Sequence, residues 1–331
     1  NSMVDRRSFL KIVSGIAATA LPSTSQACIQ RNAGPRVVII GAGVAGVRAA
    51  VRLKQYAQGM NITLVDPIGH GKPSPFAKIN SLIMTNSSVS LSITGINIVS
   101  QRVIEVDPVS KRVLLQNFGE IYADLLFLAP CVELKHDDRI NNPLNDSSLQ
   151  RQLKAMKDGD NVIVSIPKAP YQYPQGPYIN ISRIAEYLHT RRPGSKVIVF
   201  DHNSGSSIAK LYRRQWLKTV STARIERVEV EAGYIDDANY ETGIVNTADG
   251  AISGGVIALM DEQRAAAVAR EAGLSPHNDW CHVKPRTLES LHYPDVYVLG
   301  DANDAAQNDK TAFTAVQQAD AFVREITARI V

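Results

Sequence analysis

The sequence is poor in cysteine and in aromatic residues, and it carries no strong charge of either sign. Its 331 residues include three cysteines, so the chain is not a small disulfide-stabilised scaffold, and it is long enough for two domains. An aromatic content of 6% argues against a protein that stacks on nucleic-acid bases. The formal charge is +4, and residues 5–11 supply half of it, so we expect no nucleic-acid or other polyanionic partner.

The first 27 residues have the order of a bacterial export signal. The pair Arg6-Arg7 precedes Lys11, an apolar run at 12–21 and small residues up to Ala27, as in twin-arginine signal peptides. The run is shorter than the roughly 20 residues of a membrane span. A basic amphipathic first helix also fits, but the order of the features favours a signal. We therefore expect a periplasmic protein that folds around a cofactor before export, and not an integral membrane protein.

Residues 37–66 carry the pattern of a dinucleotide-binding β-α-β unit. An apolar strand precedes the motif GAGVAG, which starts at Gly41, and an amphipathic helix then leads to a second strand that ends in Asp66. Gly41 would permit the tight turn, Gly43 the approach of a pyrophosphate, and Gly46 close packing of helix on strand. Asp66 would accept hydrogen bonds from a ribose hydroxyl. The pattern predicts a bound dinucleotide.

The C-terminal part of the chain favours FAD over NAD. A strand at 296–299 ends in Gly300-Asp301 and is followed by an amphipathic helix. In flavoproteins with two dinucleotide-type domains, such a Gly-Asp pair contacts the ribityl and pyrophosphate part of the flavin. A capping or turn role is the alternative for Asp301. Short strands between residues 97 and 128 predict an antiparallel meander that closes over the adenine at Val103.

A second β-α-β pattern starts near residue 161. Its first strand-to-helix turn reads PKAPYQYPQGPYIN and lacks the glycine motif, so we predict no second dinucleotide and do not expect NADH as the donor. The predicted class is α/β with two Rossmann-like domains and a small inserted meander. The FAD domain is discontinuous, at 34–155 and 285–331, and the second domain covers 156–284.

Several stretches together resemble one flavoprotein family. They are RRSFLK, VVIIGAGVAG, QGPYINISRIAEYLHTRRPGSKVIVFD, AREAGLSPHNDWCHV and VLGDANDAAQNDKTAFTAVQQADA. The chain resembles the flavoprotein subunit of flavocytochrome c sulfide dehydrogenase, a relative of sulfide:quinone oxidoreductase and of glutathione-reductase-type enzymes. The resemblance spans most of the chain.

The resemblance implies a redox disulfide that this chain lacks. One family cysteine matches Cys281, the predicted catalytic residue, and its partner falls at Tyr173. A further family cysteine, which tethers the flavin, falls near residues 74–76, where the sequence has none, so FAD would be noncovalent. A single thiol cannot run a dithiol cycle, so the sulfur donor would react at the flavin itself. An inert thiol packed on Trp280 is the alternative for Cys281. Pairing with Cys131 is not favoured, because Cys131 follows a strand end near the pyrophosphate.

The resemblance also implies a function. It implies an exported FAD oxidoreductase that passes electrons from sulfide or another small sulfur compound to a c-type cytochrome subunit. A flavin-binding protein without turnover, acting as a structural partner, and a quinone-linked sulfide oxidoreductase are the alternatives. Lys310 and Thr311 match the family's loop over the flavin. No spacing of His136, His277 or His282 matches a zinc site, so no metal is predicted. The predicted cofactor-binding residues are Gly41, Ala42, Gly43, Ala45, Gly46, Asp66, Pro67, Val103, Ala129, Gly300, Asp301, Lys310 and Thr311.

Overall fold

The computed structural model describes residues 34–67, 95–135, 146–219, 224–230, 234–277, 279–305 and 310–330. Three predictions fall outside these ranges: the signal peptide at 1–27, the position of the flavin-tethering cysteine at 74–76, and His136. None of the helices in the described part of the chain combines the length and the apolar character that a membrane-spanning segment requires.

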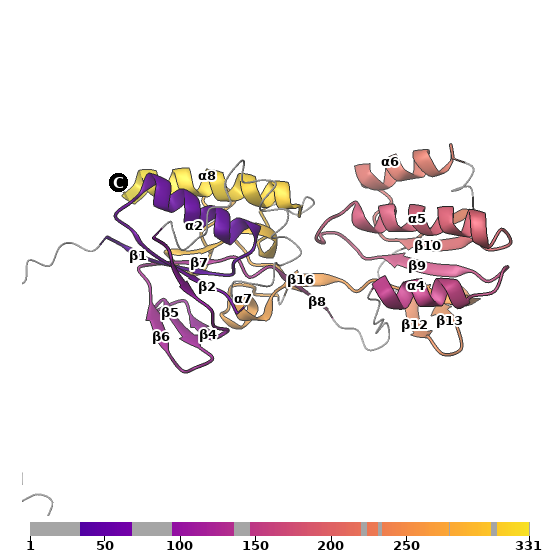
Figure 1. The fold of residues 1–331 in the computed structure, drawn as a ribbon, viewed down its shortest axis with the longest axis horizontal. Helices are drawn as coiled ribbons and strands as arrows, with labels where there is room; N and C mark the ends of the chain where they lie inside the picture. Colours follow the sequence, from indigo (N-terminus) through magenta and orange to yellow (C-terminus); the bar gives the residue numbers. More distant parts are fainter. Residues whose placement is uncertain are drawn as a thin grey trace, which may run out of the picture. The chain divides into compact units, whose positions relative to one another are not determined.

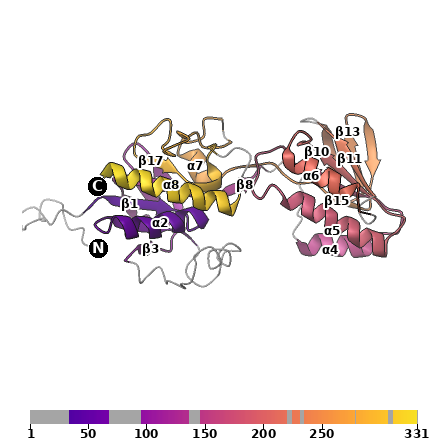
Figure 2. The same ribbon diagram turned by 90° about the horizontal axis from the view of Figure 1, so that it is seen from above.

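The first unit is built on a parallel sheet of five strands in the order β17-β7-β1-β2-β3. Helices α2 and α8 lie side by side on one face of this sheet (Figures 1 and 2). Between these two helices, the Arg48 guanidinium donates to both carboxylate oxygens of Asp320 at 2.7 Å. The elements are β1 (Arg36–Ile40), α2 (Val44–Tyr56), β2 (Asn61–Val65), β3 (Asn97–Val99), β7 (Leu125–Leu128), β17 (Val296–Val298) and α8 (Ala312–Ile330).

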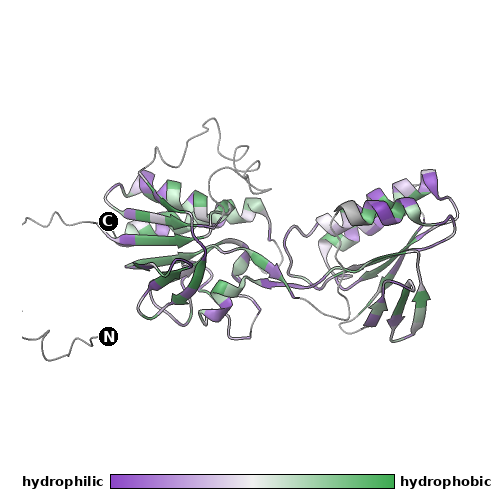
Figure 3. Cartoon of the chain, turned by 60° about the horizontal axis from the view of Figure 1, so that its bottom comes forward, coloured by the Kyte–Doolittle hydropathy of each residue, from purple (hydrophilic) through white to green (hydrophobic). Residues whose placement is uncertain are grey.

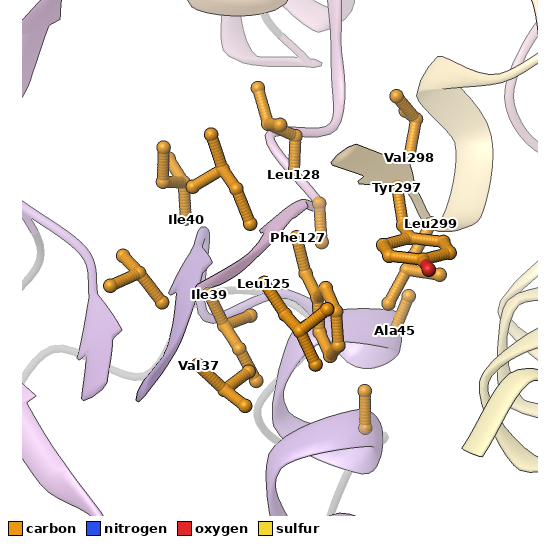
Figure 4. Close-up of a cluster of buried hydrophobic side chains, with 14 of the residues drawn as sticks. Val37, Ile39, Ile40, Ala45, Leu125, Phe127, Leu128, Tyr297, Val298 and Leu299 are labelled. Carbon is orange, nitrogen blue, oxygen red and sulfur yellow. The ribbon is translucent and has the colours of Figure 1, made fainter. Parts of the chain in front are cut away.

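The core of this unit lies between the sheet and the helices. β1 and β7 are apolar along their length, because a parallel strand covered on both faces has no solvent side. Figure 4 shows Phe127 of β7 in the middle of this cluster, and its ring makes edge-to-face contacts with Tyr297 and Phe322 at 5.4 and 4.8 Å between centroids. Phe322 belongs to α8, so the core contains residues from both ends of the described chain.

Two antiparallel additions complete the first unit. The predicted meander is present as β4 (Val103–Asp107), β5 (Arg112–Leu115) and β6 (Glu120–Tyr122). Strand β8 (Val132–Leu134) pairs with β16 (Gln263–Ala265), so the segment that follows β7 runs beside the one that precedes α7 (Ala267–Glu271).

The second unit repeats the same construction with a parallel sheet in the order β11-β10-β9-β15. Its central strands β9 and β10 are mostly apolar and fully buried, as the green colour of Figure 3 shows, whereas its helices carry polar residues along one side. The elements are α4 (Asp146–Ala155), β9 (Val162–Ile166), α5 (Gly176–Arg191), β10 (Val197–Asp201), α6 (Ser207–Trp216), β11 (Ile225–Glu229), the antiparallel strands β12 (Ile235–Asn239), β13 (Ile244–Thr247) and β14 (Gly250–Ser253), and β15 (Val256–Ala258). The predicted fold class, α/β with two Rossmann-like units, is confirmed.

Residues near the boundaries predicted at 155/156 and 284/285 pack in hydrophobic clusters of both units. Leu153 of α4 packs in the core of the second unit, whereas Ala265, Leu274 and Cys281 pack in the core of the first. The chain crosses between the units at the β8–β16 ladder, which no local sequence signal marks.

Candidate functional site

The glycine motif forms a tight turn between β1 and α2. Gly41 has a φ of +100°, and a Cβ atom there would lie 2.3 Å from the carbonyl oxygen of Ala129. A Cβ atom at Gly46 would lie 2.0 Å from the carbonyl oxygen of Gly41. Gly43 differs, since a Cβ atom there would meet none of the described atoms within 4 Å. Gly41 and Gly46 therefore lie where the turn packs too closely for a side chain, whereas Gly43 faces open space.

The start of α2 offers donors to an anion. Gly43 is the N-cap residue of α2. Among the described residues, no side chain forms a capping hydrogen bond at this end of the helix, and the first turn contains no acidic residue. The N-terminal N–H groups of a helix lack partners within the helix and carry its positive dipole end, which favours a phosphate. The backbone N–H of Ala42 donates to the Asp66 carboxylate at 2.7 Å, so the acid at the end of β2 lies against the glycine turn. The exposed Pro67 follows it.

The C-terminal Gly-Asp pair lies at the same place. Gly300 has a φ of +75°, and a Cβ atom there would lie 3.0 Å from the Cβ atom of Ala45 in α2. Its N–H donates to the side chain of Gln318 in α8 at 3.1 Å. Gly300 begins the short 3-10 helix η3 (Gly300–Ala302), which contains Asp301. The fold therefore brings the two motifs together, although they are far apart in the sequence.

Two of the other predicted residues occupy the edges of this region. Val103 starts β4 and packs against the core of the first unit. The hydroxyl of Thr311 accepts a hydrogen bond from the N–H of Thr314 at 3.2 Å, at the beginning of α8. Neither observation places these side chains at the glycine turn.

Lys310 is a buried cation that holds the Gly-Asp loop. Its ammonium donates to the carbonyl oxygens of Asp301 and Asn303 at 2.7 Å each, and it lies 3.9 Å from the centroid of the Trp280 ring. Burial, opposed in part by the charge of Asp301, lowers the pKa of Lys310 to about 8. Lys310 was predicted to lie in a loop over the flavin. The structure adds that its ammonium binds backbone oxygens.

Cys281 is fully buried beside this lysine. Its backbone N–H donates to Ala302 at 2.9 Å and its carbonyl oxygen accepts from Asp304 at 3.0 Å, so it lies against the Gly-Asp loop. Burial first, and the charge of Asp304 second, raise the pKa of the thiol to about 12, although Lys310 acts in the opposite direction. Cys281 is a protonated thiol at neutral pH, as its packing in the core also indicates.

Tyr173, where the sequence resemblance predicts the second redox cysteine, lies on a loop of the second unit. Its side chain is 55% exposed, and its backbone has a φ of +56°. Its N–H donates to the carbonyl oxygen of Lys310 at 2.8 Å. A backbone hydrogen bond therefore joins the loop that carries Tyr173 to Lys310, whose ammonium binds the Gly300-Asp301 loop.

Both cysteines in the described part of the chain, Cys131 and Cys281, are free thiols. Cys131 comes two residues after Ala129 and has a φ of +69°, a backbone conformation that glycine adopts more readily. Burial is the main reason that its pKa is raised. Across the ranges given above, no group of three or more His, Cys, Asp or Glu residues could hold a metal ion.

The burial of Cys281 predicts slow alkylation in the folded protein. With a pKa of about 12, only about 1 in 10,000 of these thiols is a thiolate at pH 8, against roughly a quarter of ordinary cysteine thiols. We expect iodoacetamide at pH 8 to modify Cys281 about 1,000-fold more slowly in native protein than in urea-unfolded protein. Peptide mass spectrometry over time measures both rates. Equal rates would mean that Cys281 is reactive in the folded chain.

Comparison with known proteins finds similarity to sulfide oxidoreductases. The central region of the flavoprotein chain of sulfide dehydrogenase (flavocytochrome c) matches residues 147–260. The mitochondrial sulfide:quinone oxidoreductase of Mus musculus is 21% identical over 339 residues, which cover 93% of this chain and 74% of the mouse protein. The resemblance predicted from the sequence is confirmed.

Solved structures show the same fold as this chain. The sulfide:quinone oxidoreductase of Aquifex aeolicus has a TM-score of 0.70 at 17% identity, over 90% of this chain and 77% of that one. A ferredoxin reductase from Rhodopseudomonas palustris has a TM-score of 0.61 at 20% identity, over 89% and 76% of the two chains. The match to the central region of the sulfide dehydrogenase flavoprotein chain includes the loop with Tyr173.

Proposed function

We propose that this chain is a FAD-dependent oxidoreductase of the sulfide dehydrogenase type. It would take electrons from sulfide or another small reduced sulfur compound and pass them to a c-type cytochrome. The observation that carries the proposal is the meeting of the glycine turn with the Gly300-Asp301 loop at the start of α2, in a chain whose central region matches that family.

The residues at this place fit FAD. Gly43 leaves open space where a pyrophosphate would need to approach the backbone, and the start of α2 offers N–H groups to the phosphate oxygens. Asp66 would bind the ribose, and Asp301 would bind the ribityl chain. FAD, when bound, would supply the acceptor for two electrons. We propose noncovalent binding, because the sequence has no cysteine at 74–76.

The chain's own residues would bind and orient the reactants. Oxidation of hydrosulfide to the level of elemental sulfur releases two electrons and one proton, so two one-electron transfers to a haem complete each cycle. The charge of Lys310 lies beside Cys281 and the Asp301 backbone, where it would stabilise negative charge that develops nearby. Cys281 is protonated and buried, so it would pack beside the site without acting as the initial nucleophile.

A flavin-binding protein without turnover is the second candidate function. Tyr173 at the position of a redox cysteine favours it, and so does the burial of the remaining thiol. Such a protein would bind FAD through the same residues and would act as a structural or assembly partner of a cytochrome.

Anaerobic reduction separates the two candidates. We expect the purified full chain to contain FAD that acid releases. Sulfide should bleach the flavin absorption near 450 nm within the time of one catalytic cycle. Cytochrome c added afterwards should then be reduced. Flavin that sulfide does not bleach would support the protein without turnover, and a Tyr173→Cys variant then tests whether only the dithiol was lost. Reduction of a quinone instead of cytochrome c would identify the quinone-linked alternative. A colourless protein that takes up no FAD would contradict all three.

We also propose export to the periplasm by the twin-arginine route. The support is the order of Arg6-Arg7, the apolar run and the small residues before Ala27 in the sequence. Cell fractionation of the full chain, compared with an Arg6→Lys/Arg7→Lys variant, tests this. Equal periplasmic amounts of both proteins would contradict it.

A further inference from the structure

Gln172, in the loop between β9 and α5 of the second unit, bonds to the site in the first unit. Its side-chain nitrogen donates to a carboxylate oxygen of Asp301 at 2.6 Å and to the sulfur of Cys131 at 3.4 Å. Its backbone N–H donates to the side chain of Gln263 in β16 at 2.6 Å. Gln172 and Lys310 also form an isolated parallel bridge. The residue therefore contacts four separate segments of the first unit.

The chemistry of the carboxamide suits this place. A glutamine side chain has two N–H hydrogens on one nitrogen, and here one points to Asp301 and the other to Cys131. A hydrogen bond to an ionised carboxylate is stronger than one between neutral groups. Gln172 is also partly buried, which shields this bond from water. The bond fixes the direction of the Asp301 carboxylate, whose other neighbours include the backbone that Lys310 clamps.

We propose that Gln172 is a positioning residue for the flavin: from the second unit it orients the Asp301 carboxylate toward the ribityl chain. This inference rests on the proposed function, since it takes Asp301 as the residue that binds FAD. It adds a specificity element that the glycine motif does not contain. It also makes the loop that carries Gln172 and Tyr173 part of the cofactor site.

Titration of the apo-protein with FAD tests this role, with quenching of flavin fluorescence as the readout. Gln172→Ala removes both side-chain bonds, and we expect the Kd for FAD to rise about tenfold. Gln175→Ala is the matched control, because Gln175 lies in the same loop with an exposed side chain, and its Kd should equal that of the unsubstituted protein.

Gln172→Glu separates a positioning role from a merely structural one. It would place a second carboxylate against that of Asp301, and two adjacent carboxylates share a proton because their repulsion raises the pKa of one of them. FAD binding by this variant should therefore be weak at pH 8 and should recover as the pH falls to 5.5, while the unsubstituted protein changes little. A structural role alone predicts no such recovery.

The outcomes also distinguish this inference from the proposed function. If the unsubstituted protein binds FAD and all three variants bind it equally well, the positioning role is wrong and the proposed function is unaffected. If Gln172→Glu binds weakly at both pH values, the contact with Asp301 is not the cause and the inference also fails. If the unsubstituted protein binds no FAD, the proposed function fails first.

Discussion

A Gly43→Val substitution should weaken FAD binding about 100-fold and leave the fold intact. A Cβ atom at Gly43 would contact none of the described atoms within 4 Å, so the folded apo-protein has room for the side chain. A pyrophosphate bound to the start of α2 would compete for that same room. Overpacking of this kind costs about 3 kcal/mol, which corresponds to an increase in Kd of about 100-fold.

The measurement combines FAD titration with urea denaturation of the apo-protein. Gly46→Val is the control, because a Cβ atom there would lie 2.0 Å from the Gly41 carbonyl oxygen, and this variant should lose stability without any cofactor. The explanation fails if Gly43→Val binds FAD as tightly as the unsubstituted protein, or if it destabilises the apo-protein as much as Gly46→Val does.

Arg227→Met should strongly destabilise the second unit. The guanidinium of Arg227 donates to Asp201 at the end of β10, with its Nε atom 2.9 Å from the carboxylate oxygen. Asp201 is fully buried, and it also accepts hydrogen bonds from the Tyr178 hydroxyl at 3.1 Å and from the N–H of Asn203 at 2.8 Å. Removal of one partner of a buried ion pair leaves an uncompensated charge and costs about 3–5 kcal/mol.

Urea denaturation followed by tryptophan fluorescence measures this effect. Trp216 is a local reporter, because its ring lies 6.0 Å from that of Tyr178 between centroids. Arg36→Met is the matched control, since its bond to Asp124 is exposed and should contribute less than about 1 kcal/mol. A further Asp201→Leu change in Arg227→Met should recover part of the loss. Similar free energies of unfolding for Arg227→Met and Arg36→Met would show that the buried pair contributes little.

The elements that the sequence predicted well are those with local signals. The strand before Gly41, the helix after it and the strand that ends in Asp66 lie within 31 residues, and periodicity and glycine spacing define each of them. The returning strand before Gly300 is similarly marked by an apolar run. Parallel strands place their carboxyl ends at one edge, so the meeting of Gly300 with α2 follows from the fold class.

The residues that sequence reasoning missed depend on contacts between distant segments. Gln172 and Asp301 are 129 positions apart, and glutamine in a loop carries no signal of its own. The loop's proline and tyrosine content indicated only that no dinucleotide binds there. Lys310 was expected near the flavin, but the direction of its ammonium depends on the carbonyl oxygens of Asp301 and Asn303, which no pattern predicts. The pairing of β8 with β16 is likewise a contact between distant segments that no local pattern predicts.

The pairing of Asp201 with Arg227 has a consequence for how electrons would travel. In a dinucleotide-binding unit the acid at this strand end binds a ribose, but here its oxygens are already bonded to three groups of the protein. A reductase that binds two dinucleotides can accept electrons at one of them while the other passes electrons on. With a single flavin, donor and acceptor must take turns at the same redox centre, so double-reciprocal plots at several acceptor concentrations should give parallel lines.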